Sequence, residues 1–226
     1  MRTPTLFAAA ALFAVAACSG DSAASTDPTA TGTTSTGVTI FADTTLKTDS
    51  VVAGSAIPIR VHIVQNGVPI ANVLVVWSVT SGGGSVPAAS SVTDSTGVAA
   101  ITWTVGDTLG ANALTASIAG ASIVVTATTI AGPVSTLVKV SADSDAVVAS
   151  ASLALTVRTV DRFGNGVAGV TVNWASSGGS LTAASTVSGP NGNATANFTS
   201  DARPATYSVT AAVPGRASVT FRVIGL

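Results

Sequence analysis

Hydrophobic and polar residues alternate over several short stretches of the chain. Ile59, Val61 and Ile63 are each separated by one polar residue, and residues 217–223 show the same alternation. A repeat of two residues is typical of a β-strand that buries one face and exposes the other. No stretch after residue 18 keeps the 3.6-residue repeat of a helix over even three turns. The pattern therefore predicts an all-β protein.

The alternating pattern occurs twice along the chain. The stretch NGVPIANVLVVWSVTSGGGSV aligns with the later stretch NGVAGVTVNWASSGGSL, which places Trp77 opposite Trp174. Further along, Trp103 aligns with Phe198. All four aromatic residues fall on the apolar side of their strands, so we expect them in the interior. A self-similar spacing of this size indicates a duplicated domain.

Turn-forming residues separate the predicted strands. Glycine and asparagine tolerate the positive φ of tight turns, and they occur at Asn66-Gly67, Gly82-Gly83-Gly84, Asn165-Gly166, Gly178-Gly179 and Asn191-Gly192. Many short strands joined in this way predict two tandem immunoglobulin-like β-sandwiches, at residues 38–131 and 132–226. The breaker sequence Ala131-Gly132-Pro133 marks the expected seam between them.

The amino terminus has the features of an export signal. Residues 1–17 carry Arg2 and then an apolar run that is too short to span a membrane. The tetrad Val15-Ala16-Ala17-Cys18 resembles the bacterial lipobox, which implies that Cys18 is lipidated. Ordinary secretion with an incidental cysteine is the alternative. In that resemblance, Ser19 after the cysteine favours sorting to the outer membrane, on the periplasmic or the surface side.

Residues 18–37 contain small and polar residues without apolar periodicity. Such a segment cannot bury enough apolar surface to offset the entropy of ordering. We therefore expect the lipidated cysteine to be followed by a flexible tether that reaches to residue 37.

Several motifs resemble the bacterial immunoglobulin-like (Ig-like) repeat of the invasin and intimin group. They are DRFGNGVAGVTVNW from Asp161, the following GGSL, the TDSTGVA turn from Thr93 and the closing VTAAVPG from Val209. The resemblance covers nearly all of the predicted folded part, although Gln65 stands where the second copy has Asp161. It implies Ig-like sandwiches stacked end to end on a bacterial surface. The outer-membrane barrel and lectin-like tip of that group have no counterpart in this sequence.

Composition argues against several functions. Only 8% of the residues are charged, and the 9 basic and 10 acidic residues form no run of one sign, so we expect no nucleic-acid partner. The single cysteine excludes an intrachain disulfide. The one histidine, His62, lies at an outward strand position, and no Gly-x-Ser-x-Gly motif occurs. We therefore expect neither an enzyme nor a cofactor.

Acidic residues offer at most a weak metal site. Asp143 and Asp145, with Asp161 near the same end, are the best candidates for calcium at a domain junction. Calcium prefers six to eight oxygen ligands, so we expect no metal site there. Asp161 and Asp94 are better interpreted as residues that cap their own turns.

One surface differs between the two copies. Leu74 and Val76 occupy outward positions of the Trp77 strand, where the second copy has polar Thr171 and Asn173. An apolar outward pair predicts an interaction face, unless another strand or loop covers it.

The sequence as a whole indicates a lipid-anchored, non-catalytic protein of the cell envelope. We expect it to act as a surface-display spacer or as an adhesion and protein-interaction module, with an envelope protein or polysaccharide as partner. The alternative is an accessory carbohydrate-binding module, which would need aromatic side chains that face solvent.

Overall fold

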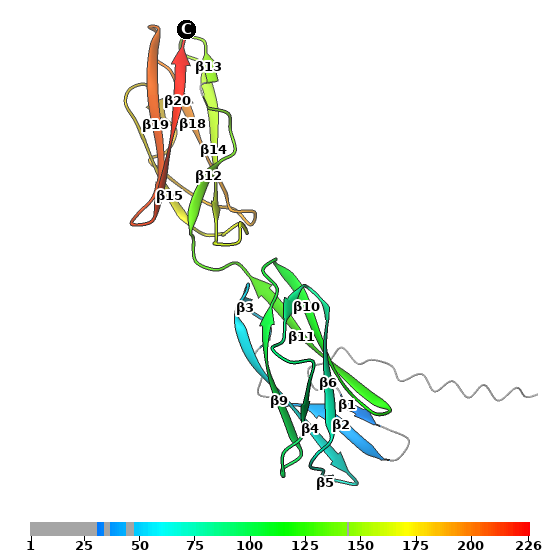
Figure 1. Cartoon of the computed structure of the whole chain (residues 1–226). Helices are drawn as coiled ribbons and strands as arrows, with labels where there is room; N and C mark the ends of the chain where they lie inside the picture. The colour runs from blue at the N-terminus through cyan, green and yellow to red at the C-terminus, as the bar shows by residue number, and fades with distance from the viewer. Residues whose placement is uncertain (1–30, 34–36, 44–47, 144) are drawn as a thin grey trace, which may run out of the picture.

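The computed structural model describes residues 31–33, 37–43, 48–143 and 145–226, and Figure 1 shows their arrangement. These residues form strands and connecting loops without a helix. The described part of the chain accordingly has no helix with the length and apolarity needed to cross a membrane. The predicted signal peptide and Cys18 lie outside the described residues. The all-β prediction is confirmed.

The first sandwich consists of two sheets that face each other. One sheet has the order β1-β2-β4-β9-β7, with β5 beside β4, and the other has the order β3-β11-β10-β6-β8. The strands are β1 (Thr31–Thr33), β2 (Val38–Ala42), β3 (Val51–Val52), β4 (Ala56–Gln65), β5 (Val68–Pro69), β6 (Leu74–Ser81), β7 (Gly84–Ser85), β8 (Ser90–Val92), β9 (Val98–Val105), β10 (Gly110–Ile118) and β11 (Ala121–Ile130).

The second sandwich repeats this topology. Its sheets have the orders β12-β14-β18-β16 and β13-β20-β19-β15-β17. The strands are β12 (Thr136–Lys139), β13 (Asp145–Val147), β14 (Ser152–Val160), β15 (Thr171–Ser176), β16 (Ser180–Leu181), β17 (Ser185–Val187), β18 (Asn193–Thr199), β19 (Ala205–Val213) and β20 (Ala217–Gly225). In both sandwiches a short strand near the start pairs in parallel with the last strand, β3 with β11 and β13 with β20. Such an arrangement in both halves is typical of immunoglobulin-like sandwiches.

Each sandwich has its own hydrophobic core. The first core contains Ile59, Val61 and Ile63, which have no exposed surface, as their alternation predicts. The second contains Leu155 and Val157 at the matching positions of β14. Since the two clusters share no residue, each half can stabilise itself by burying its own apolar surface.

Tryptophan occupies the same place in the two cores. Trp77 and Trp174 are 3% and 5% exposed. The indole N–H of Trp77 donates to the Ser91 hydroxyl at 2.9 Å, and that of Trp174 donates to the Thr186 hydroxyl at 2.8 Å. In both cases the hydroxyl comes from the neighbouring edge strand, β8 or β17, and it satisfies the one polar group of a large buried side chain.

A third tryptophan is buried without such a partner. Trp103 has no exposed surface, and its Nε1 is the one buried side-chain polar atom of the described residues that lacks a hydrogen bond. Its counterpart Phe198 is buried equally well and has no polar group to satisfy. The prediction that these positions point inward is confirmed in both copies.

One predicted turn has a different geometry. Asn66 and Gly67 adopt the expected positive φ values of 52° and 81°, but in the second copy Gly164 does so, at 85°, in place of Asn165 and Gly166. The expectation for Asn165-Gly166 was therefore wrong. Gly166 is needed for another reason, because a Cβ there would overlap the backbone of Asn191.

The structure also differs from the expected tether at its end. Residues Thr31–Thr33 form β1, which pairs antiparallel with β2. Gly32 also lets β1 lie close to β11 of the other sheet, because a Cβ at this position would lie 2.5 Å from the backbone oxygen of Ser122. Backbone pairing thus adds residues 31–33 to the edge of this sheet.

Candidate functional site

The two sandwiches are joined end to end by residues 131–135, between β11 and β12 (Figure 1). The loop that follows β14, with the sequence Asp161-Arg162-Phe163-Gly164-Asn165, lies beside this linker. We call residues 161–165 the junction loop. Asp161 is only 3% exposed and organises the loop through its two carboxylate oxygens.

Each oxygen of the Asp161 carboxylate accepts two hydrogen bonds. Oδ1 accepts from the backbone N–H groups of Phe163 at 2.8 Å and Asn165 at 2.9 Å. Oδ2 accepts from the Asn165 side-chain amide and from the backbone N–H of Gly132, both at 3.1 Å. The prediction that Asp161 caps its own turn is confirmed. The bond to Gly132 adds a function that the sequence did not reveal, because it ties the loop to the linker.

The junction loop also reaches the first sandwich. The Asn165 side-chain amide donates to the backbone oxygen of Asp107 at 2.7 Å, and the Arg162 guanidinium donates to the backbone oxygen of Gly54 at 3.4 Å. One loop therefore contacts its own turn, the linker and the neighbouring domain. Such contacts oppose the free relative motion that is the default for domains on a short linker.

Gly54 shows that the first sandwich is adapted to this contact. Its φ is +69°, and a Cβ there would overlap the Phe163 ring. The matching turn of the second sandwich has Ser150 with a φ of 58°, which shows that the turn alone accepts a side chain. Glycine is therefore required at position 54 because Phe163 packs against it.

A cavity of about 620 Å³ opens at the junction. Its walls come from both sandwiches and the linker, and they include Ser55, Pro133, Arg162, Phe163 and Arg216. The Phe163 side chain is 41% exposed, and the Arg162 guanidinium lies 4.4 Å from the centre of its ring. Arg216 donates to the backbone oxygen of Val134 in the linker at 3.1 Å.

Hydrogen bonds set the charge state of the junction. Burial raises the pKa of the Asp161 carboxyl, but the bonds from Asn165, Gly132 and Phe163 outweigh this effect and hold the pKa below its usual value. The carboxylate is thus ionised at neutral pH, and in this charged form it accepts all four hydrogen bonds.

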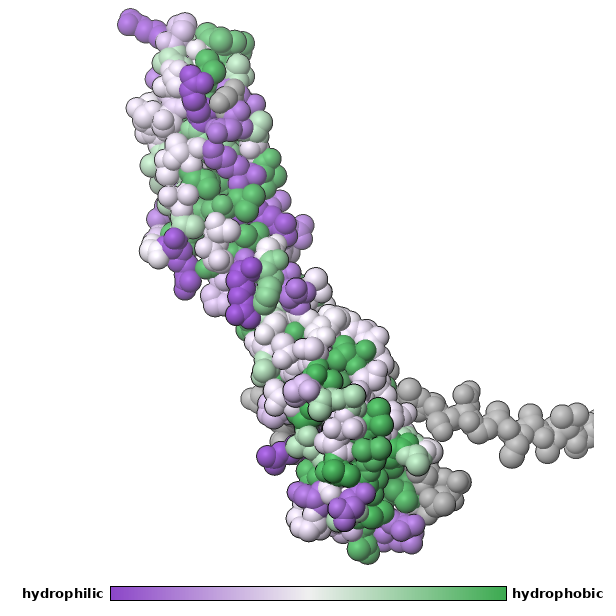
Figure 2. Space-filling model, viewed as in Figure 1, coloured by the Kyte–Doolittle hydropathy of each residue, from purple (hydrophilic) through white to green (hydrophobic). Residues whose placement is uncertain are grey.

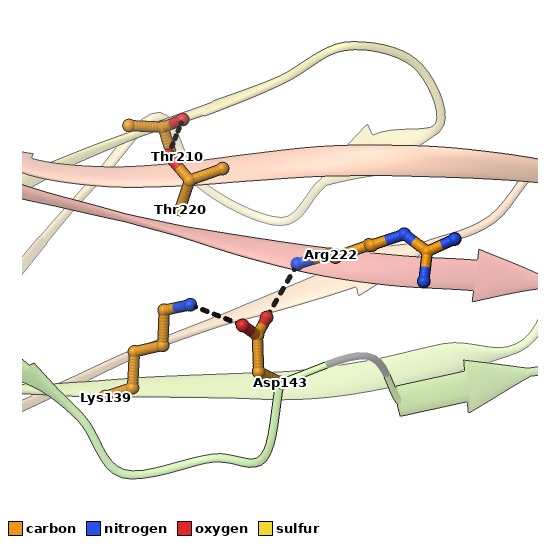
Figure 3. Close-up of polar contacts among 5 residues, drawn as sticks. All are labelled: Lys139, Asp143, Thr210, Thr220 and Arg222. Atoms are coloured by element: carbon orange, nitrogen blue, oxygen red, sulfur yellow. Dashed lines mark hydrogen bonds and ion pairs between the residues drawn. The ribbon is translucent and has the colours of Figure 1, made fainter.

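The acidic residues considered for calcium make separate contacts and do not share a site. Asp143 forms an ion pair with Lys139 at 2.9 Å and accepts a 2.9 Å hydrogen bond from the backbone N–H of Arg222 (Figure 3). It thereby joins the segment after β12 to β20, near the Thr210–Thr220 hydroxyl pair shown in the same view. Among the described residues, no group of three or more histidine, cysteine, aspartate or glutamate side chains is placed to hold a metal ion.

His62 and Asp94 both make contacts within the first sandwich. His62 stacks on Phe41 with ring centres 5.2 Å apart. Asp94 accepts hydrogen bonds from the hydroxyl and backbone of Thr96 and from the backbone of Val98, which lower its pKa. The turn-capping prediction for Asp94 is confirmed.

The predicted interaction face is exposed. Leu74 and Val76 are 57% and 45% exposed, and Val92, which pairs with Leu74 across the sheet, is 58% exposed. We call these three residues the Leu74 face. Beside it lies a shallow hollow of about 350 Å³ that Ser117 and Ile118 help to line. Figure 2 shows apolar residues gathered on this sandwich toward the viewer.

Sequence reasoning missed Phe163 and Arg162. It considered the aromatic residues that alternate within strands, whereas Phe163 lies in a loop and is exposed. The signal that could have found them is loop length, because three residues separate Asp161 from Asn165 whereas Gln65 directly precedes Asn66. Extra loop length at one end of a repeat indicates a contact that the other copy lacks.

Comparison with known proteins supports the fold. Residues 137–224 match the model of the bacterial Ig-like domain (group 1). This match spans β12 to β20, apart from the outermost residues. A search of curated proteins gives no match.

Several solved structures resemble the chain. The Escherichia coli adhesin FdeC is similar with a TM-score of 0.50 and 22% identity, over 86% of this chain and 65% of that one. Invasin, described as a bacterial integrin-binding protein, has a TM-score of 0.40 and 23% identity over 82% of this chain and 39% of that one. Part of intimin has a TM-score of 0.45 and 17% identity, over 83% and 99%. At these identities the likeness concerns the fold.

The lowered pKa of Asp161 leads to a prediction about acid. The hydrogen bond from Gly132 should persist above about pH 4, the usual pKa of an unfolded aspartate. It should weaken as the pH falls through the lower folded pKa, because protonation removes the charge that favours it. We expect the Gly132 amide signal to shift in an NMR titration from neutral to acid pH.

Asp161→Asn is the control, because its side chain does not titrate. The Gly132 shift should then be nearly independent of pH. An equal shift in the variant, or none in the unaltered chain, would contradict the assignment.

Proposed function

We propose a function from one premise: residues 137–224 match the model of the group 1 bacterial Ig-like domain. The chain is a non-catalytic protein of the bacterial cell envelope, anchored through lipid on Cys18. It displays two stacked sandwiches and takes part in adhesion or protein interaction. The outer membrane is the proposed site, with the anchor on its periplasmic or its surface side.

The end-to-end arrangement of the sandwiches carries the proposal. The chain enters the first sandwich at β1, and the last residue, Leu226, bonds to Val147 at the end of the second sandwich that points away from the first (Figure 1). The distance between membrane and distal end then depends on a tether and two sandwiches in series.

The Leu74 face supports an interaction role. Scattered exposed apolar side chains are normal, but three neighbours on adjacent strands form a contiguous patch. The outward residues of β6 and β8 include no charge that would oppose docking. We propose that a partner protein of the envelope or of another cell surface covers this face.

A sugar-binding role for the sheet faces is less well supported. Sugar-binding surfaces usually present aromatic rings to solvent, whereas Trp77, Trp103, Trp174 and Phe198 are all buried. Among the described aromatic side chains, Phe41 on β2 is partly buried, and Phe163 at the junction is exposed.

Metabolic labelling tests the anchor. Cells given radioactive palmitate should label the protein, and Cys18→Ala should abolish the label and release the protein from the membrane fraction. Protease accessibility on intact cells then reports which side of the outer membrane bears the sandwiches. Label that persists in Cys18→Ala, or unaltered protein free in the medium, would refute the anchor.

The double variant Leu74→Thr/Val76→Asn tests the interaction face. It introduces the residues that the second sandwich has at these positions, so its free energy of unfolding should change by no more than about 0.5 kcal/mol. We expect it to lose the cross-linked complexes that the unaltered chain forms on whole cells. The matched control is Thr171→Ala/Asn173→Ala, which should retain them. If Leu74→Thr/Val76→Asn retains the same complexes, the face has another role.

A further inference from the structure

Two positive groups line the junction cavity without a carboxylate partner. Arg162 and Arg216 both contribute to its walls, and each donates only to a backbone oxygen, of Gly54 and Val134 respectively. Among the described residues, Lys139 and Asp143 form the one ion pair, and neither of them lines the cavity. The one acidic residue in the wall, Asp161, already accepts four hydrogen bonds.

The charge of the surrounding domain strengthens this imbalance. Residues 132–226 contain six basic and four acidic residues, whereas residues 38–131 contain two basic and four acidic ones. The cavity thus lies where the positive half of the chain meets the negative half, with two arginines on the positive side. Guanidinium groups that have no carboxylate partner are suited to bind oxyanions in a bidentate manner.

The remaining walls suit a small, partly polar ligand. Ser55 and Ser135 supply hydroxyls, and Pro133 and Phe163 supply apolar surface. A volume of about 620 Å³ falls within the range of small-molecule sites, which often form between domains. Phe163 provides the exposed aromatic ring that the sheet faces lack.

A peptide is a poorer fit than a sugar. Extended peptides usually bind by adding a strand to a sheet edge. The strand that lines this cavity, β3, has only two residues, which is too short to pair with an added peptide strand. Hydroxyls, an aromatic ring and a cationic pair in a compact cavity match a charged monosaccharide unit more closely.

We propose that the junction cavity binds an anionic sugar residue, a monosaccharide unit with a carboxylate or a phosphate group, such as one in an envelope polysaccharide. Arg162 and Arg216 bind the oxyanion, and the serine hydroxyls and Phe163 contact the sugar ring. This binding goes beyond the proposed display role and does not depend on the lipid anchor.

Ligand titration of the full-length chain, followed by two-dimensional NMR, tests the proposal. The probes are sodium glucuronate, a glucose phosphate ester, uncharged glucose and inorganic phosphate. We expect at least one of the two sugar anions to shift the signals of Gly54, Gly132 and Phe163 in a saturable way, with a dissociation constant of about 1 mM. The sugar anion with the lower dissociation constant shows whether the site prefers a carboxylate or a phosphate group. Glucose and inorganic phosphate should each bind at least about tenfold more weakly.

Variants locate the site. Arg162→Ala/Arg216→Ala should weaken sugar-anion binding by at least about tenfold, because it removes the charge-assisted hydrogen bonds. Arg203→Ala removes an exposed arginine outside the cavity wall and should bind normally. Unchanged signals elsewhere in the spectrum show that the double variant is folded, and Arg162→Lys/Arg216→Lys, which keeps the charge, should bind with intermediate affinity.

Three results would overturn the proposal. They are the absence of saturable shifts with both sugar anions, equally tight binding of inorganic phosphate, and equal weakening by Arg203→Ala. Each is independent of the palmitate experiment, so the anchor and the sugar site stand or fall separately.

Discussion

The hydrogen bonds of the Asp161 carboxylate determine how the two halves of this chain are joined. Oδ1 closes the junction loop on itself, and Oδ2 binds the backbone N–H of Gly132 in the linker. A closed loop presents Asn165 and Phe163 to the first sandwich, at Asp107 and Gly54. Without this carboxylate the linker would lose its hydrogen bond at Gly132 and the loop would lose its closure, so the domains would reorient more freely.

The sandwiches need no such device for their own folding. Neither contains a disulfide, since the single cysteine is Cys18. Each instead buries a tryptophan whose indole N–H is satisfied by a hydroxyl on the edge strand, Ser91 or Thr186. The cores are separate while the junction is polar and partly open, so a ligand can enter between two stable units without disturbing either core.

Local patterning predicted the fold but not the site. The two-residue alternation around Val61 and the aligned Trp77 and Trp174 were enough to predict two sandwiches, because burial of one face leaves a periodic trace in the sequence. The junction depends on contacts between residues about a hundred positions apart, such as Arg162 with Gly54. No periodicity encodes such a pair. The left-handed turn at Gly164 was also missed, because Asn165-Gly166 fits a tight hairpin turn equally well on local grounds.

The central claim is that Asp161 fixes the orientation of the two sandwiches. Spin labels on cysteines at exposed Ser90 and Ser185, with Cys18→Ser to remove the native thiol, allow pulsed electron paramagnetic resonance to measure the distance distribution between the domains. The account predicts one narrow distribution for the chain with Asp161 and a much broader one for Asp161→Ala, with both sandwiches still folded. A distribution of the same width in the two proteins would contradict it.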